Sequence, residues 1–114
     1  MHESGLTEDL FAHTMQHARE VEARRVTHIC VRIGALSDAT PESIRFYFET
    51  MAAGTIAEGA ALEFEQAPGR AHCGSCDQDV EIDELFGACP RCGALALTIT
   101  GGNAVYLDSL EVET

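Results

Sequence analysis

Cys73-Gly74-Ser75-Cys76 and Cys89-Pro90-Arg91-Cys92 are the two stretches that decide how this chain folds, and 12 residues separate them. In a reducing compartment, paired CxxC stretches at such a spacing are typical of a metal site rather than of two disulfides. Each stretch presents two thiolates from one tight turn. Four thiolates form the closed tetrahedral set that Zn²⁺ prefers, so the sequence predicts zinc bound by Cys73, Cys76, Cys89 and Cys92.

Iron in the same sulfur geometry is the alternative metal, because Cys-Pro-x-Cys-Gly also occurs in rubredoxins. Rubredoxins bury that site in an aromatic-rich core, whereas residues 70–100 offer only Phe86. A four-coordinate zinc has no open position, so we expect it to organise structure and to activate no water. Residues 70–100 also contain few large apolar side chains, so metal binding would supply much of their folding free energy.

The rest of the chain shows helical and strand periodicities on either side of this segment. We expect the following elements: a helix over residues 6–24 with Ser4 as N-cap, a strand at 27–33, a helix that begins at Thr40-Pro41 and ends at Gly54, strands at 60–66 and 104–112, a turn at Pro68-Gly69, and short strands at 80–82 and 95–99. This order predicts an α+β fold in which two helices pack on a small three-stranded sheet. A zinc-ribbon-like lobe held by four cysteines, residues 70–100, is inserted into a domain formed by residues 1–69 plus 101–114.

The composition is that of an acidic globular protein. Hydrophobic residues make up 46% of the chain, and 7 Lys and Arg against 19 Asp and Glu give a formal charge of −12. Such a surface repels nucleic acid and anionic membranes. No apolar run approaches the roughly 20 residues of a membrane span, and the N-terminus lacks the features of a signal peptide. We therefore expect a cytoplasmic protein with no nucleic-acid or membrane partner. It shows no phosphate-binding loop or nucleophile elbow, so we do not expect an enzyme.

The N-terminus, Met1-His2-Glu3, is the second informative feature. A free α-amine, the amide nitrogen of residue 2 and the imidazole of His2 can chelate one ion, and the amide of Glu3 completes four nitrogens in a plane. That arrangement suits Ni²⁺ or Cu²⁺, whose d-electrons favour square geometry. On spacing alone, a frayed terminus without metal is the more common outcome.

Four features together resemble the HypA/HybF family of nickel metallochaperones in [NiFe]-hydrogenase maturation. They are the Met-His-Glu start, a strand that ends in Ile-Gly-Ala-Leu-Ser, a helix that reads Glu-Ser-Ile-Arg-Phe-Tyr-Phe-Glu, and the late CxxC-x12-CxxC lobe. The resemblance covers nearly the whole chain, including the closing residues 109–113. It is specific, because the terminal Met-His-Glu and the cysteine lobe are unrelated features.

The resemblance implies that His2 is the essential nickel ligand, with the Met1 amine and the backbone at His2 and Glu3 as co-ligands. It implies nickel as transported cargo and zinc as a structural ion. The partners that it implies are the hydrogenase-maturation GTPase, the hydrogenase large-subunit precursor and, in some members, urease-maturation proteins. Some relatives carry an acidic residue near the nickel where direct alignment places Thr40. Whether Asp38 or Glu42 takes that role here stays open, and we assign neither.

A second function fits the same residues without nickel. The cysteine lobe alone could make the chain a zinc-ribbon protein-interaction module. Cys30, on the strand face that also carries His28, is interpreted as a small buried hydrophobic side chain. A nickel titration of the zinc-loaded protein separates the two functions, because only a metallochaperone needs the free N-terminus.

Overall fold

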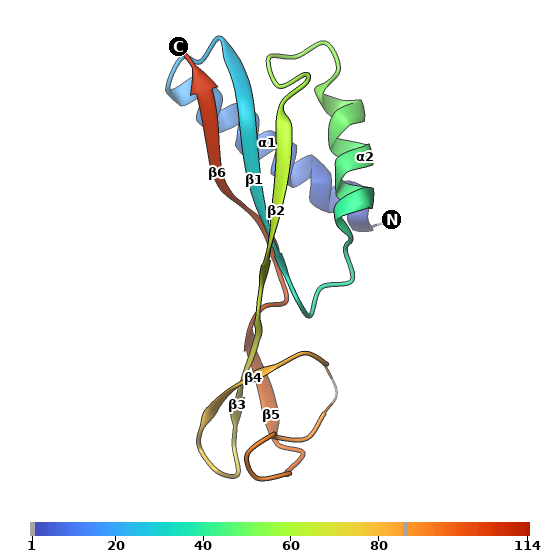
Figure 1. Ribbon diagram of the computed structural model, residues 1–114, viewed down its shortest axis with the longest axis vertical. Helices are drawn as coiled ribbons and strands as arrows, with labels where there is room; N and C mark the ends of the chain where they lie inside the picture. The colour runs from blue at the N-terminus through green and yellow to red at the C-terminus, as the bar shows by residue number, and fades with distance from the viewer. Residues whose placement is uncertain (1, 86) are drawn as a thin grey trace. The chain divides into compact units, whose positions relative to one another are not determined.

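The structure is a computed structural model that describes residues 2–85 and 87–114 (Figure 1). Its elements follow the chain as α1 (His2–Glu20), β1 (Arg25–Gly34), α2 (Pro41–Ala52), β2 (Ala61–Ala67), β3 (Gly69–Cys73), β4 (Asp79–Ile82), β5 (Leu97–Gly101) and β6 (Val105–Glu113). They form two compact units. The first contains the segments up to Arg32, Ala39–Glu65 and Val105–Thr114, and the second contains Ile33–Asp38 and Gln66–Ala104.

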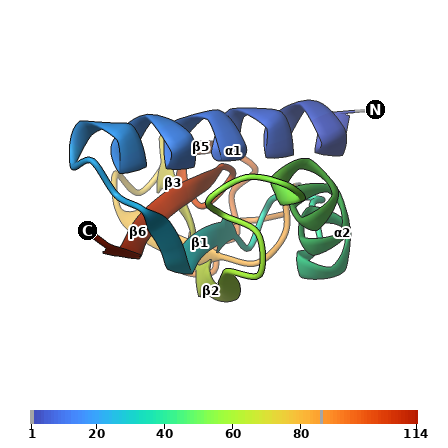
Figure 2. The same cartoon turned by 90° about the horizontal axis from the view of Figure 1, so that it is seen from above.

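The first unit is a three-stranded sheet in the order β2-β1-β6, and both helices lie on one side of it (Figure 2). The central strand β1 alternates as predicted, because Ile29 and Val31 are fully buried beneath the helices. Ile44 and Phe48 of α2 are buried in the same core. The last strand returns to this sheet, which confirms the predicted α+β fold with an inserted lobe.

The chain of β6 runs antiparallel to that of β1. The N–H of Arg24 donates to the carbonyl of Glu113 at 2.7 Å, and further along the hydroxyl of Thr27 donates to the carbonyl of Glu111 at 3.2 Å. β1 and β2 run in the same direction, and α2 forms the crossover between them (Figure 1). Parallel strands require such a crossover, so the order strand, helix, strand fixes the arrangement.

The start of α2 is where the sequence predicted it. The hydroxyl of Thr40, whose backbone is extended, accepts the N–H of Ser43 at 3.2 Å, and Pro41 occupies the first turn. At the other end, the helix stops at Ala52, and Gly54 has a positive φ of 80°. Both boundaries therefore follow from the residue types that favour them.

The predicted bounds of the first helix are wrong at both ends. α1 begins at His2, so Ser4 lies inside the helix and is not its N-cap. The first turn carries no apolar residue, so periodicity could not reveal it. α1 ends at Glu20 because Glu22 adopts a φ of 54°, its N–H bonding to Arg19 and that of Ala23 to Ala18. These two bonds form a Schellman motif without the glycine that usually marks one in the sequence.

The second unit is a three-stranded sheet in the order β4-β3-β5, with both pairs antiparallel. The prediction of a turn at Pro68-Gly69 is wrong, because Gly69 already lies in β3 opposite Ile82. Pro68 lacks an N–H and separates β2 from β3, which belong to different sheets. The core of this unit consists of Ala71, Cys73, Val80 and Cys89, and partly buried Cys76, Ile82, Ala94, Leu97 and Ile99 pack against it. Its cysteines therefore form much of its interior.

Two glycines of the second unit allow backbones to touch. A Cβ on Gly34 would lie 2.2 Å from the carbonyl oxygen of Gly102, and one on Gly102 would lie 2.2 Å from that of Pro68. Gly102 also has a φ of +79°, which side chains rarely adopt. Only glycine therefore fits at these two positions, because any side chain would collide with the neighbouring backbone.

Candidate metal centre

The two cysteine turns are copies of each other in their backbone hydrogen bonds. In the first, the N–H of Asp77 donates to the carbonyl of Cys73 at 2.9 Å, and in the second that of Gly93 donates to Cys89 at 2.8 Å. The fifth residue of each turn has a positive φ, 58° at Asp77 and 77° at Gly93. An N–H of each turn also points at sulfur: that of Cys76 lies 3.5 Å from Cys73 Sγ, and that of Arg91 lies 3.4 Å from Cys89 Sγ. Each thiol pair therefore lies on a turn with the same backbone hydrogen bond and the same left-handed fifth residue.

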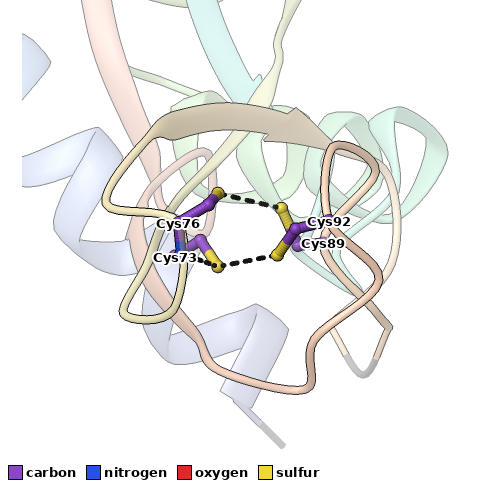
Figure 3. A group of neighbouring side chains, drawn as sticks. All are labelled: Cys73, Cys76, Cys89 and Cys92. Atoms are coloured by element: carbon purple, nitrogen blue, oxygen red, sulfur yellow. Dashed lines mark hydrogen bonds between the residues drawn. The ribbon is translucent and has the colours of Figure 1, made fainter.

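The four sulfur atoms converge between the two turns (Figure 3). Cys73 Sγ lies 3.6 Å from Cys92 Sγ, Cys76 Sγ lies 3.8 Å from Cys89 Sγ, and all four lie within 4.8 Å of one another. None of these cysteines forms a disulfide. Zn–S bonds of about 2.3 Å at tetrahedral angles require sulfur atoms about 3.8 Å apart. The donor set and its spacing therefore fit a tetrahedral, sulfur-liganded metal ion.

The thiols of this cluster have opposite tendencies to ionise. Backbone N–H groups of Cys76 and Ser75 lower the pKa of Cys73 to about 6. Burial, together with hydrogen bonds to neighbouring thiols, raises the pKa of Cys76 to about 12. Burial also opposes ionisation of Cys89, but the N–H of Arg91 and of the next residue outweigh it and lower that pKa. Such a group shares a small number of protons, which a cation displaces when it binds.

His72 adjoins this cluster without belonging to it. Its Nδ1 lies 2.9 Å from Asp79 and its Nε2 lies 2.9 Å from Asp77. Both ring nitrogens are therefore engaged, and hydrogen bonds to Asp79 and then Asp77 raise the pKa of His72. The ring supports the left-handed Asp77 turn rather than supplying a fifth ligand.

The predicted nickel ligands lie at the start of α1. His2 and Glu3 belong to its first turn, and Met1 lies outside the described residues. Both views place this end of α1 beside the first turn of α2, which carries Glu42 (Figures 1 and 2). The hydroxyl of Thr40 caps α2. The residue that stands at the acidic position of some relatives therefore has a structural task here.

A second group of metal-ligating atoms lies on the first sheet, and sequence reasoning missed it. The ligand atoms of Cys30, Glu65 and Asp108 lie within 4.8 Å of one another. Cys30 is buried as predicted, but it faces these carboxylates. The three residues come from β1, β2 and β6, so only the strand order brings them together.

The chain matches, over residues 1–112, the family described as "Hydrogenase/urease nickel incorporation, metallochaperone, hypA". The chain belongs to the HypA family. It is 42% identical over 113 residues to hydrogenase maturation factor HypA 2 of Bradyrhizobium diazoefficiens, covering 99% of this chain and 100% of the relative. It is 41% identical to hydrogenase maturation factor HypA of Dechloromonas aromatica with the same coverage. These matches confirm the resemblance drawn from the four sequence features.

Solved HypA structures share the fold. The solution structure of the nickel metallochaperone HypA from Helicobacter pylori superposes with a TM-score of 0.74 at 26% identity, covering 97% of each chain. A second HypA solution structure gives 0.75 at 27% identity, covering 98% of this chain and 96% of the other. The family match and both superpositions therefore span both units. Among the described residues, no helix has the length and apolar character needed to cross a membrane.

Proposed function

We propose that this protein is a cytoplasmic nickel metallochaperone that binds Ni²⁺ at Met1, His2 and Glu3 and delivers it for [NiFe]-hydrogenase or urease maturation. The observation that carries this proposal is the match to a nickel-incorporation family over residues 1–112, which includes the chelating terminus. Nickel binding belongs to residues 1–69 plus 101–114, and zinc binding belongs to residues 70–100. The protein carries metal and catalyses no reaction of its own.

The position of His2 and Glu3 in the first turn of α1 supports the backbone part of the chelate. The first amides of an α-helix have no intrahelical acceptor, so a metal ion that binds those nitrogens displaces no hydrogen bond that they donate within the helix. The positive end of the helix dipole also favours amide nitrogens that have lost their protons to Ni²⁺. The α-amine and imidazole complete a set of nitrogen ligands that suits a square-planar ion.

A planar chelate is incompatible with helical backbone at the same residues. Helical amides all point along the helix axis, whereas a square-planar ion needs its nitrogens in one plane around it. Nickel binding therefore removes His2 and Glu3 from α1 and moves the start of the helix to Ser4, whose side chain is a preferred N-cap. The chelate stays at the surface, where a partner can exchange ligands with the ion.

The four cysteines hold structural zinc under this proposal. Their tetrahedral spacing and their all-sulfur donor set fit Zn²⁺, and the closed set leaves no coordination position for a substrate. Because the cysteines also form the core of the second unit, the ion replaces the large apolar core that this unit lacks. The lobe thereby offers a folded surface to partners.

The proposed partners are the hydrogenase-maturation GTPase, the hydrogenase large-subunit precursor and the urease-maturation proteins. The formal charge of −12 disfavours nucleic acid as a partner. It also favours the approach of cations and of basic surfaces, and that attraction weakens as salt rises.

The test is a Ni²⁺ titration of tag-free, zinc-loaded protein, followed by calorimetry and absorbance. Wild type should bind one nickel with a square-planar spectrum. His2→Ala and a chain extended by one residue before Met1 should both lose that binding. His13→Ala, on the exposed surface of the same helix, is the matched control and should bind as wild type does. Equal binding by all forms would favour the zinc-ribbon interaction module instead.

A further inference from the structure

The face of the first sheet that lies opposite the helices carries a polar pocket of about 290 Å³. Cys30 lies on the central strand β1, Glu65 on β2 and Asp108 on β6, so each strand contributes one ligand atom. The side chain of Cys30 is only 7% exposed, whereas those of Glu65 and Asp108 are 54% and 36% exposed. A sulfur atom at the pocket floor and two carboxylates at its rim thus share one opening.

Arg32, from the same strand as Cys30, forms ion pairs with both carboxylates. Arg32 Nη2 lies 3.0 Å from Glu65, but its Nε lies 3.8 Å from Asp108, beyond hydrogen-bond distance. That Nε is buried and has no hydrogen-bond partner. Arg32 therefore neutralises the two carboxylates, but it does not donate two parallel hydrogen bonds to either of them, as a guanidinium can.

We propose that Cys30, Glu65 and Asp108 form a second cation site, which takes a borderline-soft divalent transition-metal ion such as Zn²⁺ or Ni²⁺. Sulfur excludes hard ions such as Mg²⁺ as the preferred occupant, and two carboxylates supply the remaining charge. Binding displaces the Cys30 proton and moves Arg32 away from the carboxylates. Three protein ligands leave the remaining coordination positions to water, so the bound ion can exchange. This site is separate from the terminal chelate and needs neither His2 nor a free amine.

Co²⁺ is the probe, because a cobalt–thiolate bond produces a charge-transfer absorption that nitrogen and oxygen ligands do not. Zinc-loaded full-length protein is titrated with Co²⁺ in excess Mg²⁺, which occupies carboxylates non-specifically. Wild type should develop the sulfur-to-cobalt band, and Cys30→Ser should lack it. Any band that Cys30→Ser retains belongs to exchange at the four-cysteine site and is subtracted.

Two exposed variants test the same site without altering the core. Glu65→Gln and Asp108→Asn should each weaken cobalt binding by roughly tenfold or more while Cys30 remains. Glu63→Gln is the matched control, because Glu63 lines the same pocket but pairs with His28 at 3.0 Å. Arg32→Gln should tighten binding by roughly tenfold, because it removes a competing positive charge.

Identical cobalt spectra for wild type and Cys30→Ser would overturn this proposal, as would unchanged affinity in both carboxylate variants. Loss of affinity in Arg32→Gln would also contradict it and would make the pocket a structural ion-pair network. The extension before Met1 leaves the cobalt band intact if the site exists. The extension before Met1 tests only the terminal nickel site, and Cys30→Ser tests only this second site, so either proposal can be refuted without the other.

Discussion

The ring of Phe11 in α1 meets the ring of Phe48 in α2 edge to face, with centroids 5.5 Å apart and planes at 70°. This contact joins the helix that begins at the proposed nickel ligands to the helix whose N-cap is Thr40. Phe48 is 1% exposed, so it anchors both helices to the sheet. The position of the first turn of α1 therefore depends on the core.

Phe48→Ala should lower the free energy of unfolding by about 3–5 kcal/mol, because it removes a buried ring and leaves a cavity. Phe46→Ala is the matched control, since Phe46 lies on the same helix but is 66% exposed. Its cost should stay below about 1 kcal/mol. Denaturant unfolding followed by far-ultraviolet circular dichroism measures both, and similar costs for the two variants would contradict the packing.

Ser4→Ala should lower the affinity for Ni²⁺ by about fivefold, which corresponds to an N-cap worth about 1 kcal/mol. The reason is that Ser4 lies inside α1 before binding and becomes its N-cap in the proposed nickel complex. Ser4→Asp keeps a capping side chain and should bind within about twofold of wild type. Calorimetry measures the affinities, and equal loss in both variants would refute the shift in helix start.

Removal of metal by a chelator should unfold the second unit and leave the first unit folded. The core of the second unit contains Cys73 and Cys89, whereas that of the first contains Ile29 and Phe48. Hydrogen exchange should therefore become fast at Ala71 and Val80 and stay slow at Val31 and Ile44. Loss of protection throughout the chain would mean that the units do not fold separately.

Gly34→Ala should destabilise the second unit by more than about 2 kcal/mol, because its Cβ would lie 2.2 Å from a backbone oxygen of Gly102. The N–H of Gly34 donates to the carbonyl of Ala104 at 2.8 Å, and the carbonyl of Gly102 accepts the N–H of Leu36 at 2.8 Å, so a shift of either backbone strains a hydrogen bond. Gly87→Ala, with no atom within 4 Å of its added Cβ, is the control and should cost little. Thermal unfolding of the two variants compares them directly.

The parts of the fold that were predictable depend on local chemistry. Thr40-Pro41 specifies the start of α2, and the alternation of Ile29 and Val31 specifies β1. The CxxC spacing indicates the two cysteine turns. Each of these signals lies within a few residues of the feature that it predicts, so a single sequence carries it.

The parts that were missed depend on backbone conformations or on pairing across the chain. Glu22 ends α1 in a left-handed conformation that usually belongs to glycine, so the sequence gives no stop signal. β3 follows a proline and pairs with β4 and β5, the strands before and after the second cysteine turn. The pocket at Cys30 requires three strands in register, and no periodicity reports register between distant strands.

The inserted lobe sets an order for folding. β6 pairs with β1 through residues that are far apart in the chain, such as Thr27 and Glu111, which are 84 positions apart. The entropy lost in closing a loop grows with the length of the loop. The lobe closes through nearer contacts, and the Gly34–Ala104 hydrogen bond then holds the end of β1 beside the residue that precedes β6. Once the lobe has folded, the loop that must close for β6 to pair with β1 is short, because Gly34 and Ala104 are already in contact. The rate at which β6 docks is thus controlled by the stability of a segment that contributes nothing to the first sheet.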